Sequence, residues 1–166
     1  MRSHRRPRSC RAIGLALAIA LIVVGCGGRS PVARLLEGQG AVEREHGGQT
    51  KAAAKGQAFV VGDAARTGAD AWARLRLRGG AVLRMGADAR IRFLAGGARL
   101  EVGDATAEDA AVTILTEAGP AIIERGGVVR ASARDGGFRF EVVVGRAEVQ
   151  GRDGAVTLEA GGGLVI

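Results

Sequence analysis

This sequence is poor in the side chains on which most enzymes and metal sites depend. Among its 166 residues there are no Tyr, one Trp, two Cys and two His. Acid–base and nucleophilic catalysis need groups with tunable pKa values or strong nucleophiles, and zinc sites are built mainly from Cys and His. The acidic residues near His46 and in the segment 104–109 lack the ligand spacing of a zinc or calcium site. We therefore expect a protein that is not an enzyme and that holds no metal or other cofactor.

The N-terminal segment has the order of an export signal. Five Arg residues precede an apolar run from Ala12 to Val24, which is followed by Gly25-Cys26. As a helix this run would span roughly 20 Å, which is too short for a hydrocarbon core of roughly 30 Å. The segment Val23–Cys26 resembles the lipobox of bacterial lipoproteins, which implies cleavage before Cys26 and lipidation of Cys26. An uncleaved anchor is the alternative.

The positive charge of the chain belongs mostly to this signal peptide. Lys and Arg number 24 against 17 Asp and Glu, but five of the Arg residues and none of the acids precede Cys26. The remainder carries 19 cations against 17 acids and is nearly neutral. Nucleic-acid binding depends on a basic surface, so we expect no nucleic-acid partner.

The rest of the chain is expected to form a tether and one domain. Residues 26–34 are small and contain a Pro, which is typical of a flexible tether, and residues 35–166 have the length of one domain with one core. The polar run that contains His46 predicts a hairpin and a solvated loop, with His46 facing solvent.

Alternation with a period of two predicts strands through most of this domain. In the segment 71–78 small and apolar residues alternate with Arg or Trp, Gly79-Gly80 suits a tight turn, and the alternation resumes over 81–85. Such units recur about every ten residues, so we expect an all-β fold of short antiparallel strands in a sandwich or a β-helix-like stack, with an N-terminal signal helix. The one exception is the segment 104–111, DATAEDAA, which we expect to be a loop or a single helical turn.

Two stretches resemble the FecR domain. The segment Val61–Asp70 is similar to the opening "vGd-x-v-x-Tg" pattern of that family, and the segments Phe138–Val142, Val144–Val149 and Val156–Gly161 are similar to its closing strands. The named members are regulators in which a cytoplasmic N-terminal part controls a sigma factor, while the β domain across the membrane receives a signal from a TonB-linked receptor. About eleven residues precede the apolar run here. The resemblance therefore implies a stand-alone extracytoplasmic FecR-like domain.

Alternation also predicts one basic face. If the small and apolar residues of the segment 73–93 point inward, a row of cations and one Trp must share the opposite side. We expect this interaction face, with its Trp as a stacking anchor, to consist of Trp72, Arg74, Arg76, Arg84, Arg90 and Arg92. An ordinary solvated sheet face, with Arg stems covering apolar surface, is the alternative.

These observations predict a lipid-anchored, non-catalytic binding or scaffold module of the bacterial cell envelope. Its partners would be the membrane, through the lipid on Cys26, and another envelope protein or an anionic envelope polymer. Gly27 follows the cysteine, where an Asp would favour inner-membrane retention, so we expect the periplasmic side of the outer membrane rather than the inner membrane. The alternative is a sensory input domain in cell-surface signalling of the sigma factor and TonB type.

Overall fold

The computed structural model of this protein describes residues 30–108, 112–115, 119–134, 137–151 and 154–165. The predicted signal helix, Cys26 and most of the predicted tether lie outside these residues. The described residues form strands and turns and no helix, which confirms the all-β prediction. None of them belongs to a helix long and apolar enough to cross a membrane.

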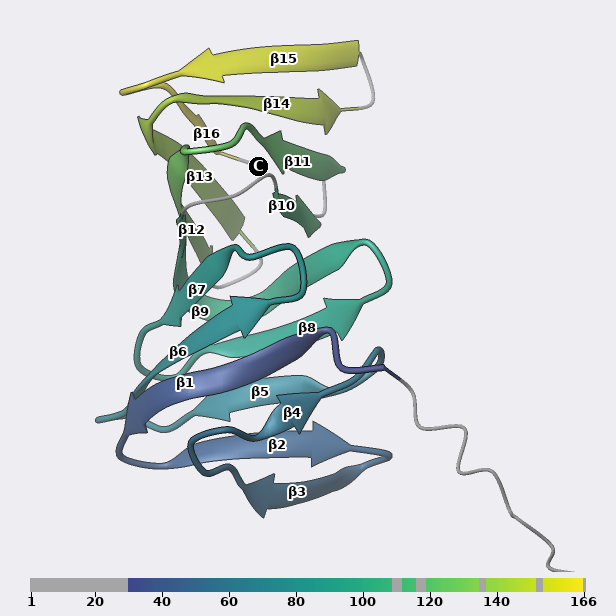
Figure 1. Cartoon of the computed structure of the whole chain (residues 1–166). Coiled ribbons are helices and arrows are strands. Elements are labelled where there is room, and N and C mark those ends of the chain that lie inside the picture. Colours follow the sequence, from purple (N-terminus) through teal and green to yellow (C-terminus); the bar gives the residue numbers. More distant parts are fainter. Residues whose placement is uncertain (1–29, 109–111, 116–118, 135–136, 152–153, 166) are drawn as a thin grey trace, which may run out of the picture.

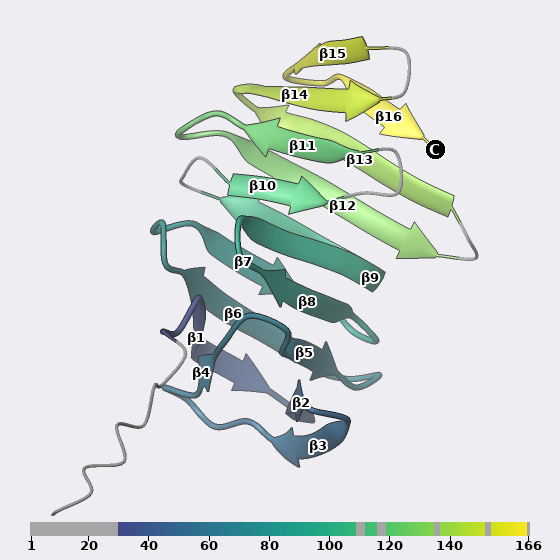
Figure 2. The same ribbon diagram turned by 90° about the vertical axis from the view of Figure 1, so that its right-hand side faces the viewer.

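The described residues form sixteen strands, which lie in two sheets that face each other (Figures 1 and 2). The strands of sheet A, in order along the sheet, are β4 (Ala58–Phe59), β1 (Ala33–Gln39), β6 (Trp72–Leu77), β7 (Val82–Met85), β9 (Gly97–Glu108), β12 (Val128–Arg134), β13 (Gly137–Val144) and β16 (Gly163–Val165). Those of sheet B are β3 (Gln49–Ala52), β2 (Val42–His46), β5 (Ala64–Thr67), β8 (Arg90–Leu94), β9 again, β10 (Val112–Leu115), β11 (Pro120–Ile123), β14 (Arg146–Gly151) and β15 (Gly154–Glu159). Neighbouring strands are antiparallel except for the pair β9 and β10.

Strand β9 joins the two sheets because it bends at Gly103. Its first half pairs with β8 in sheet B, and its second half lies between β7 and β12 in sheet A. Gly103 has a φ of 86°, and a Cβ atom there would lie 2.5 Å from the Cα atom of Ala89. Only glycine fits such a bend without strain.

The prediction of a loop or helical turn over 104–111 is wrong for residues 104–108, which continue β9. Ala105 and Ala107 are buried, whereas Asp104, Thr106 and Glu108 alternate with them and are only partly covered. The period of two is thus present, but the inward side chains are too small to mark it. Residues 109–111 lie outside the described residues.

A single hydrophobic core fills the space between the sheets. At one level Phe59 of sheet A packs against Phe93 of sheet B with a ring-centroid distance of 5.1 Å, and Leu75 faces the same core. At a higher level Phe140 and Val142 are almost fully buried. The chain passes back and forth between the two sheets, and successive strands lie further and further along them. The fold is therefore a sandwich whose strands are stacked largely in the order of the sequence (Figure 2).

The domain begins before its predicted boundary at residue 35. Strand β1 starts at Ala33, which is 3 % exposed and pairs with Phe59 and Leu77. The backbone N–H of Val32 already donates to the carbonyl of Phe59 at 2.8 Å. One buried alanine between Val32 and Arg34 produces no alternating pattern in the sequence, so the start of this strand at Ala33 could not be predicted.

Candidate functional site

The structure does not bring the six residues of the predicted basic face together. Four of them lie on β6 and β7 and project from the outer surface of sheet A, namely Trp72, Arg74, Arg76 and Arg84. Arg90 and Arg92 lie on β8 and project from the outer surface of sheet B. The reason is the turn after Met85, which carries the chain from one sheet to the other, so that β7 and β8 are neighbours in sequence but lie in different sheets.

Other strands complete the outer surface of sheet A. Cross-strand pairing places six residues in one row, in the order Glu37, Arg74, Arg84, Thr106, Arg130 and Glu141. A neighbouring row contains Asp104, Ser132 and Arg139. Since Thr106 and Ser132 are short side chains between long ones, the surface is hollowed along them.

This hollow consists of two grooves of about 340 Å³ and 200 Å³, which share Asp104, Ala105 and Thr106. We call the combined feature the sheet A groove and define it by Trp72, Arg84, Asp104, Thr106, Arg130 and Arg139. Trp72 is 40 % exposed, and its Nε1–H donates to the side-chain oxygen of Gln39 at 3.1 Å. Trp72 therefore stands partly exposed at one end of the groove, and two arginines stand at the other.

Some charges on the outer surface of sheet A are paired. Arg74 lies 3.3 Å from a carboxylate oxygen of Glu37, and Arg84 lies 3.4 Å from one of Glu108. Asp104 forms an ion pair with Arg134. A hydrogen bond from Ser132, together with Arg134, outweighs desolvation and holds the pKa of Asp104 below its ordinary value.

Three arginines on the same surface form no ion pair and no side-chain hydrogen bond among the described residues. They are Arg76, Arg130 and Arg139. All three are exposed. Exposed guanidinium groups without an internal partner keep all of their hydrogen-bond donors available for a carboxylate or phosphate.

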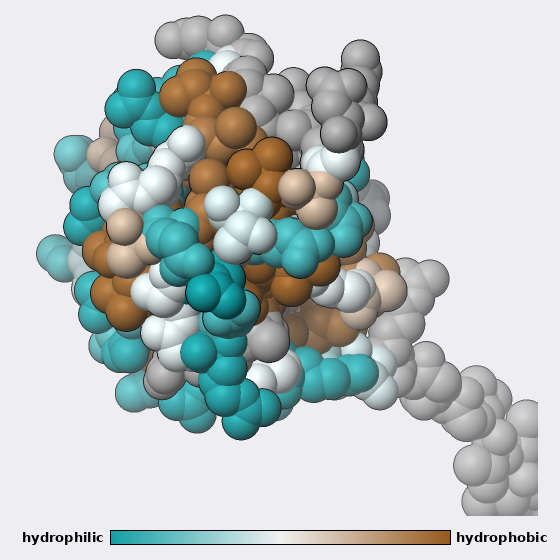
Figure 3. Space-filling model, turned by 90° about the horizontal axis from the view of Figure 1, so that it is seen from above, coloured by the Kyte–Doolittle hydropathy of each residue, from teal (hydrophilic) through white to brown (hydrophobic). Residues whose placement is uncertain are grey.

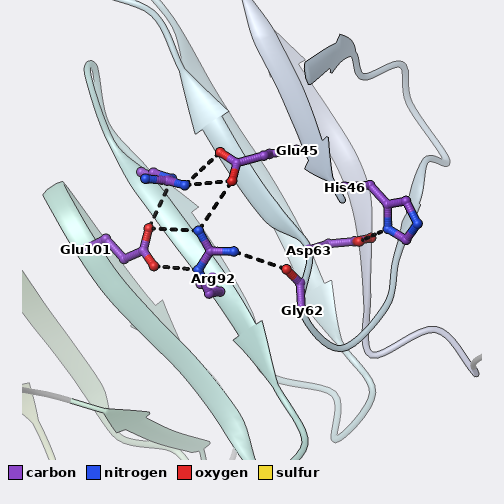
Figure 4. A network of polar contacts seen from close by, with 7 residues as sticks. Glu45, His46, Gly62, Asp63, Arg92 and Glu101 are labelled. Carbon is purple, nitrogen blue, oxygen red and sulfur yellow. Dashed lines mark hydrogen bonds and ion pairs between the residues drawn. The ribbon is translucent and has the colours of Figure 1, made fainter. Parts of the chain in front are cut away.

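The two arginines of β8 are in the opposite situation. Figure 4 shows Arg92 between Glu45 of β2 and Glu101 of β9, and Arg90 forms ion pairs with the same two acids. Arg90 Nη2 lies 2.7 Å from both carboxylate oxygens of Glu45, and Arg92 Nε lies 2.5 Å from Glu101. Arg92 also lies 3.4 Å from Glu45, and Arg90 lies 3.0 Å from Glu101. In addition, Arg92 donates a hydrogen bond to the carbonyl of Gly62 at 3.1 Å.

The four charges of this cluster sum to zero, and the pKa values of Glu45 and Arg92 are shifted within it. Burial raises the pKa of Glu45, but hydrogen bonds from Arg90 and Arg92 and their charges outweigh it, so the pKa lies below the ordinary value. The hydrogen bond to Glu101 raises the pKa of Arg92 further above its already high value. We infer that these side chains hold β2, β8 and β9 together and are not free to bind an acidic partner.

A second polar cluster surrounds the fully buried carboxylate of Asp63. Arg44 Nε donates to Asp63 at 2.7 Å, His46 Nδ1 lies 2.5 Å from the other oxygen, and the backbone N–H of Val60 donates at 2.9 Å. Desolvation raises the pKa of Asp63, but these hydrogen bonds and the charge of Arg44 outweigh it and keep the pKa below its ordinary value. Asp63 thus fixes the turn before β5.

His46 was expected to face solvent, and its side chain is indeed 56 % exposed, but one ring nitrogen contacts Asp63. This contact was not foreseen, because 17 residues separate the two. The predicted hairpin is confirmed as β2, the Gly47-Gly48 turn and β3. Within the described part of the chain, no three His, Cys, Asp or Glu side chains cluster closely enough to hold a metal ion.

Two groove residues were missed although the sequence contained a signal for them. Arg130 lies in the alternating segment Val128–Ala133, and Arg139 lies between Phe138 and Phe140. Period two alone places both on the outer side of their strands. What the sequence does not show is that β12 lies beside the second half of β9 and so continues the surface that β6 and β7 begin.

Comparisons with known proteins add a likeness of fold. No family model matches this sequence, so the FecR resemblance is not confirmed in that way. No curated protein matches it either. The structure is similar to the crystal structure of a protein from Parabacteroides distasonis ATCC 8503 that is described as a candidate anti-sigma factor, with a TM-score of 0.54 and 15 % sequence identity over 62 % of this chain. The likeness covers 54 % of that protein's length, so this chain matches about half of it.

Proposed function

We propose that this protein is a non-catalytic binding module of the bacterial cell envelope, and that the sheet A groove binds an acidic segment of another envelope protein. The observation that carries the proposal is a groove lined by two exposed, unpaired arginines, Arg130 and Arg139, with the unpaired Arg76 on the same surface. Arg90 and Arg92, which were predicted for the same face, are paired with acids of sheet B instead. Trp72 at the other end of the groove adds a rigid aromatic group of the kind that is enriched at protein interfaces.

The FecR resemblance and the shared fold with a candidate anti-sigma factor support the choice of a protein partner. They also favour a second candidate function, in which this domain is a sensory input module of cell-surface signalling. Both functions need the same property, a surface that recognises another protein. They differ in whether binding changes the activity of a regulator.

The test is a double charge reversal with a matched control. Arg76→Glu with Arg130→Glu changes the outer surface of sheet A, whereas Arg66→Glu with Arg99→Glu changes two exposed, unpaired arginines of sheet B. Crosslinked envelope complexes of the full chain should contain an identified partner for the wild type and for the control, and should lose it for the sheet A variant. Equal recovery with all three proteins would refute the outer surface of sheet A, which contains the groove, as the binding surface.

We further propose that the chain is anchored by lipid on Cys26 at the periplasmic side of the envelope, in the outer membrane. The support is the lipobox-like segment Val23–Cys26 and the Gly at position 27. Cells given labelled palmitate should label the wild-type chain and not Cys26→Ala, and membrane fractionation should place the label in the outer membrane. Equal label in both chains would contradict lipidation, and label confined to the inner membrane would contradict only the location.

A further inference from the structure

The C-terminal end of the stack has two free strand edges. Strand β15 is the last strand of sheet B and pairs with β14, and β16 is the last strand of sheet A and pairs with β13. In the described part of the chain no other strand pairs with either of them. Figures 1 and 2 show both strands at the same end of the molecule.

The hydrophobic core reaches this end and is open there. Val156 and Leu158 of β15 pair with the buried residues Val149 and Ala147 and therefore point toward the space between the sheets. Leu164 of β16 approaches the same space from sheet A, where it pairs with Phe140. Val156 is nevertheless 50 % exposed, while its neighbour Val149 is 2 % exposed. Figure 3, which looks down on this end, shows apolar side chains gathered across its middle.

The opposite end of the stack is closed in a different way. There Arg44 and His46 share the side of β2 that carries the buried Val42, and they surround Asp63, so polar groups end the core. The edge strand β3 is exposed along its whole length and carries Lys51. Charged side chains on edge strands are a common protection against pairing with another chain. Strand β15 has no Lys or Pro, and its one charge, Glu159, lies at its end.

We propose that the C-terminal end binds a second copy of this chain. A two-fold axis perpendicular to both sheets would pair β15 with β15 and β16 with β16, each antiparallel, in one step. It would also bring the open ends of the two hydrophobic cores into contact with each other. The same surface of each copy would then form the interface, as a symmetric dimer requires. A single foreign strand would satisfy only one of the two edges.

The charges of β15 are compatible with this pairing. If the axis passes through Thr157, so that the Thr157 residues of the two copies lie opposite each other and Val156 lies opposite Leu158, Glu159 lies opposite Ala155 of the other copy. The two Glu159 carboxylates are then about 14 Å apart along the strands, at about 3.4 Å per residue. That distance exceeds the Debye length of about 8 Å at physiological salt, so their repulsion is screened. No charged side chain of β15 or β16 lies at the centre of the interface.

The first test uses two copies of the full chain with different tags, expressed together. The wild-type copies should purify together, and Val156→Lys should reduce the recovered pair by at least about tenfold, because it places two lysines at the centre of the contact. The matched control is Val102→Lys, which makes the same change at a valine of similar exposure, 44 %, on β9. Failure of the wild-type copies to purify together, or equal loss with both variants, would overturn the proposal.

The second test does not depend on how well these variants fold. A photoreactive phenylalanine analogue replaces Thr157 on β15 or, as a control, Thr50 on β3, which is an exposed threonine on the edge strand of the other end. Irradiation should give a crosslinked homodimer from position 157 and not from position 50. A crosslink from position 157 to a different protein, or no crosslink, would overturn the proposal. The result is independent of the sheet A groove, since Arg76→Glu with Arg130→Glu should leave the crosslink unchanged.

Discussion

Two groups of arginines on this protein have different surroundings. Arg44, Arg90 and Arg92 each contact an acid that is buried or half-buried. Arg76, Arg130 and Arg139 have no acidic partner among the described residues. In the sequence Arg90 and Arg92 alternate with apolar residues as the second group does, whereas Arg44 lies between Glu43 and Glu45. The difference shows that an alternating pattern determines which side of a strand an arginine occupies, and that the neighbouring strands determine whether its charge is neutralised.

The largest loss of stability is expected from removing Asp63, the most buried of the acids that the paired arginines contact. Asp63→Ala leaves the guanidinium of Arg44 and the N–H of Val60 without their acceptor. Breaking a buried ion pair in this way costs about 3–5 kcal/mol, and since Arg44 is 26 % exposed we expect a value near the lower limit. Chemical denaturation measures it. Asp70→Ala, at an exposed Asp three residues beyond Thr67, should have almost no effect.

The four-membered cluster on sheet B should respond less strongly. Glu45→Gln removes the charge that Arg90 contacts through both carboxylate oxygens and that Arg92 also reaches. Because the side chains are between 19 % and 32 % exposed, water can replace part of the lost interaction, and we expect a loss of about 1–2 kcal/mol. Glu37→Gln removes the acid of a more exposed pair, with Arg74, and should cost less than about 0.5 kcal/mol. Equal losses for the two variants would contradict the distinction between the surfaces.

Stability should fall at acidic pH because of the paired group. The pKa values of Asp63 and Glu45 are lowered in the folded protein, so the unfolded chain binds protons at a higher pH than the folded chain does. These acids therefore contribute fully to the free energy of unfolding above their unfolded pKa values, near 4. This contribution is lost as the pH falls through the lower pKa values of the folded protein. Denaturation curves from pH 7 to pH 3 should show this loss. In Asp63→Asn the slope should be smaller, and an unchanged slope would exclude Asp63 as its source.

The sequence was sufficient for the fold class and for most strands, but not for this division of charges. Glycine turns and alternation located β6, β7, β12 and β13 within a residue or two. The contact of Arg90 with Glu45 joins residues 45 positions apart, and it exists only because β5 lies between β2 and β8. Alternation contains no information about which strands become neighbours, and small inward residues such as Ala105 even concealed a strand. The polar clusters and the continuous groove on sheet A were therefore beyond prediction.

The smallest effect on stability is expected at the unpaired arginines. Arg139→Ala removes an exposed side chain with no ionic partner among the described residues, so the free energy of unfolding should change by no more than about 0.5 kcal/mol. If the sheet A groove binds an acidic segment, the same variant should weaken recovery of the crosslinked partner, because one of the three available guanidinium groups is missing. Arg99→Ala, at an exposed and unpaired arginine of sheet B, should be equally harmless to stability and should leave the partner bound. A residue that can be removed without cost to the fold, but not without cost to binding, is what separates a recognition surface from an ordinary solvated one.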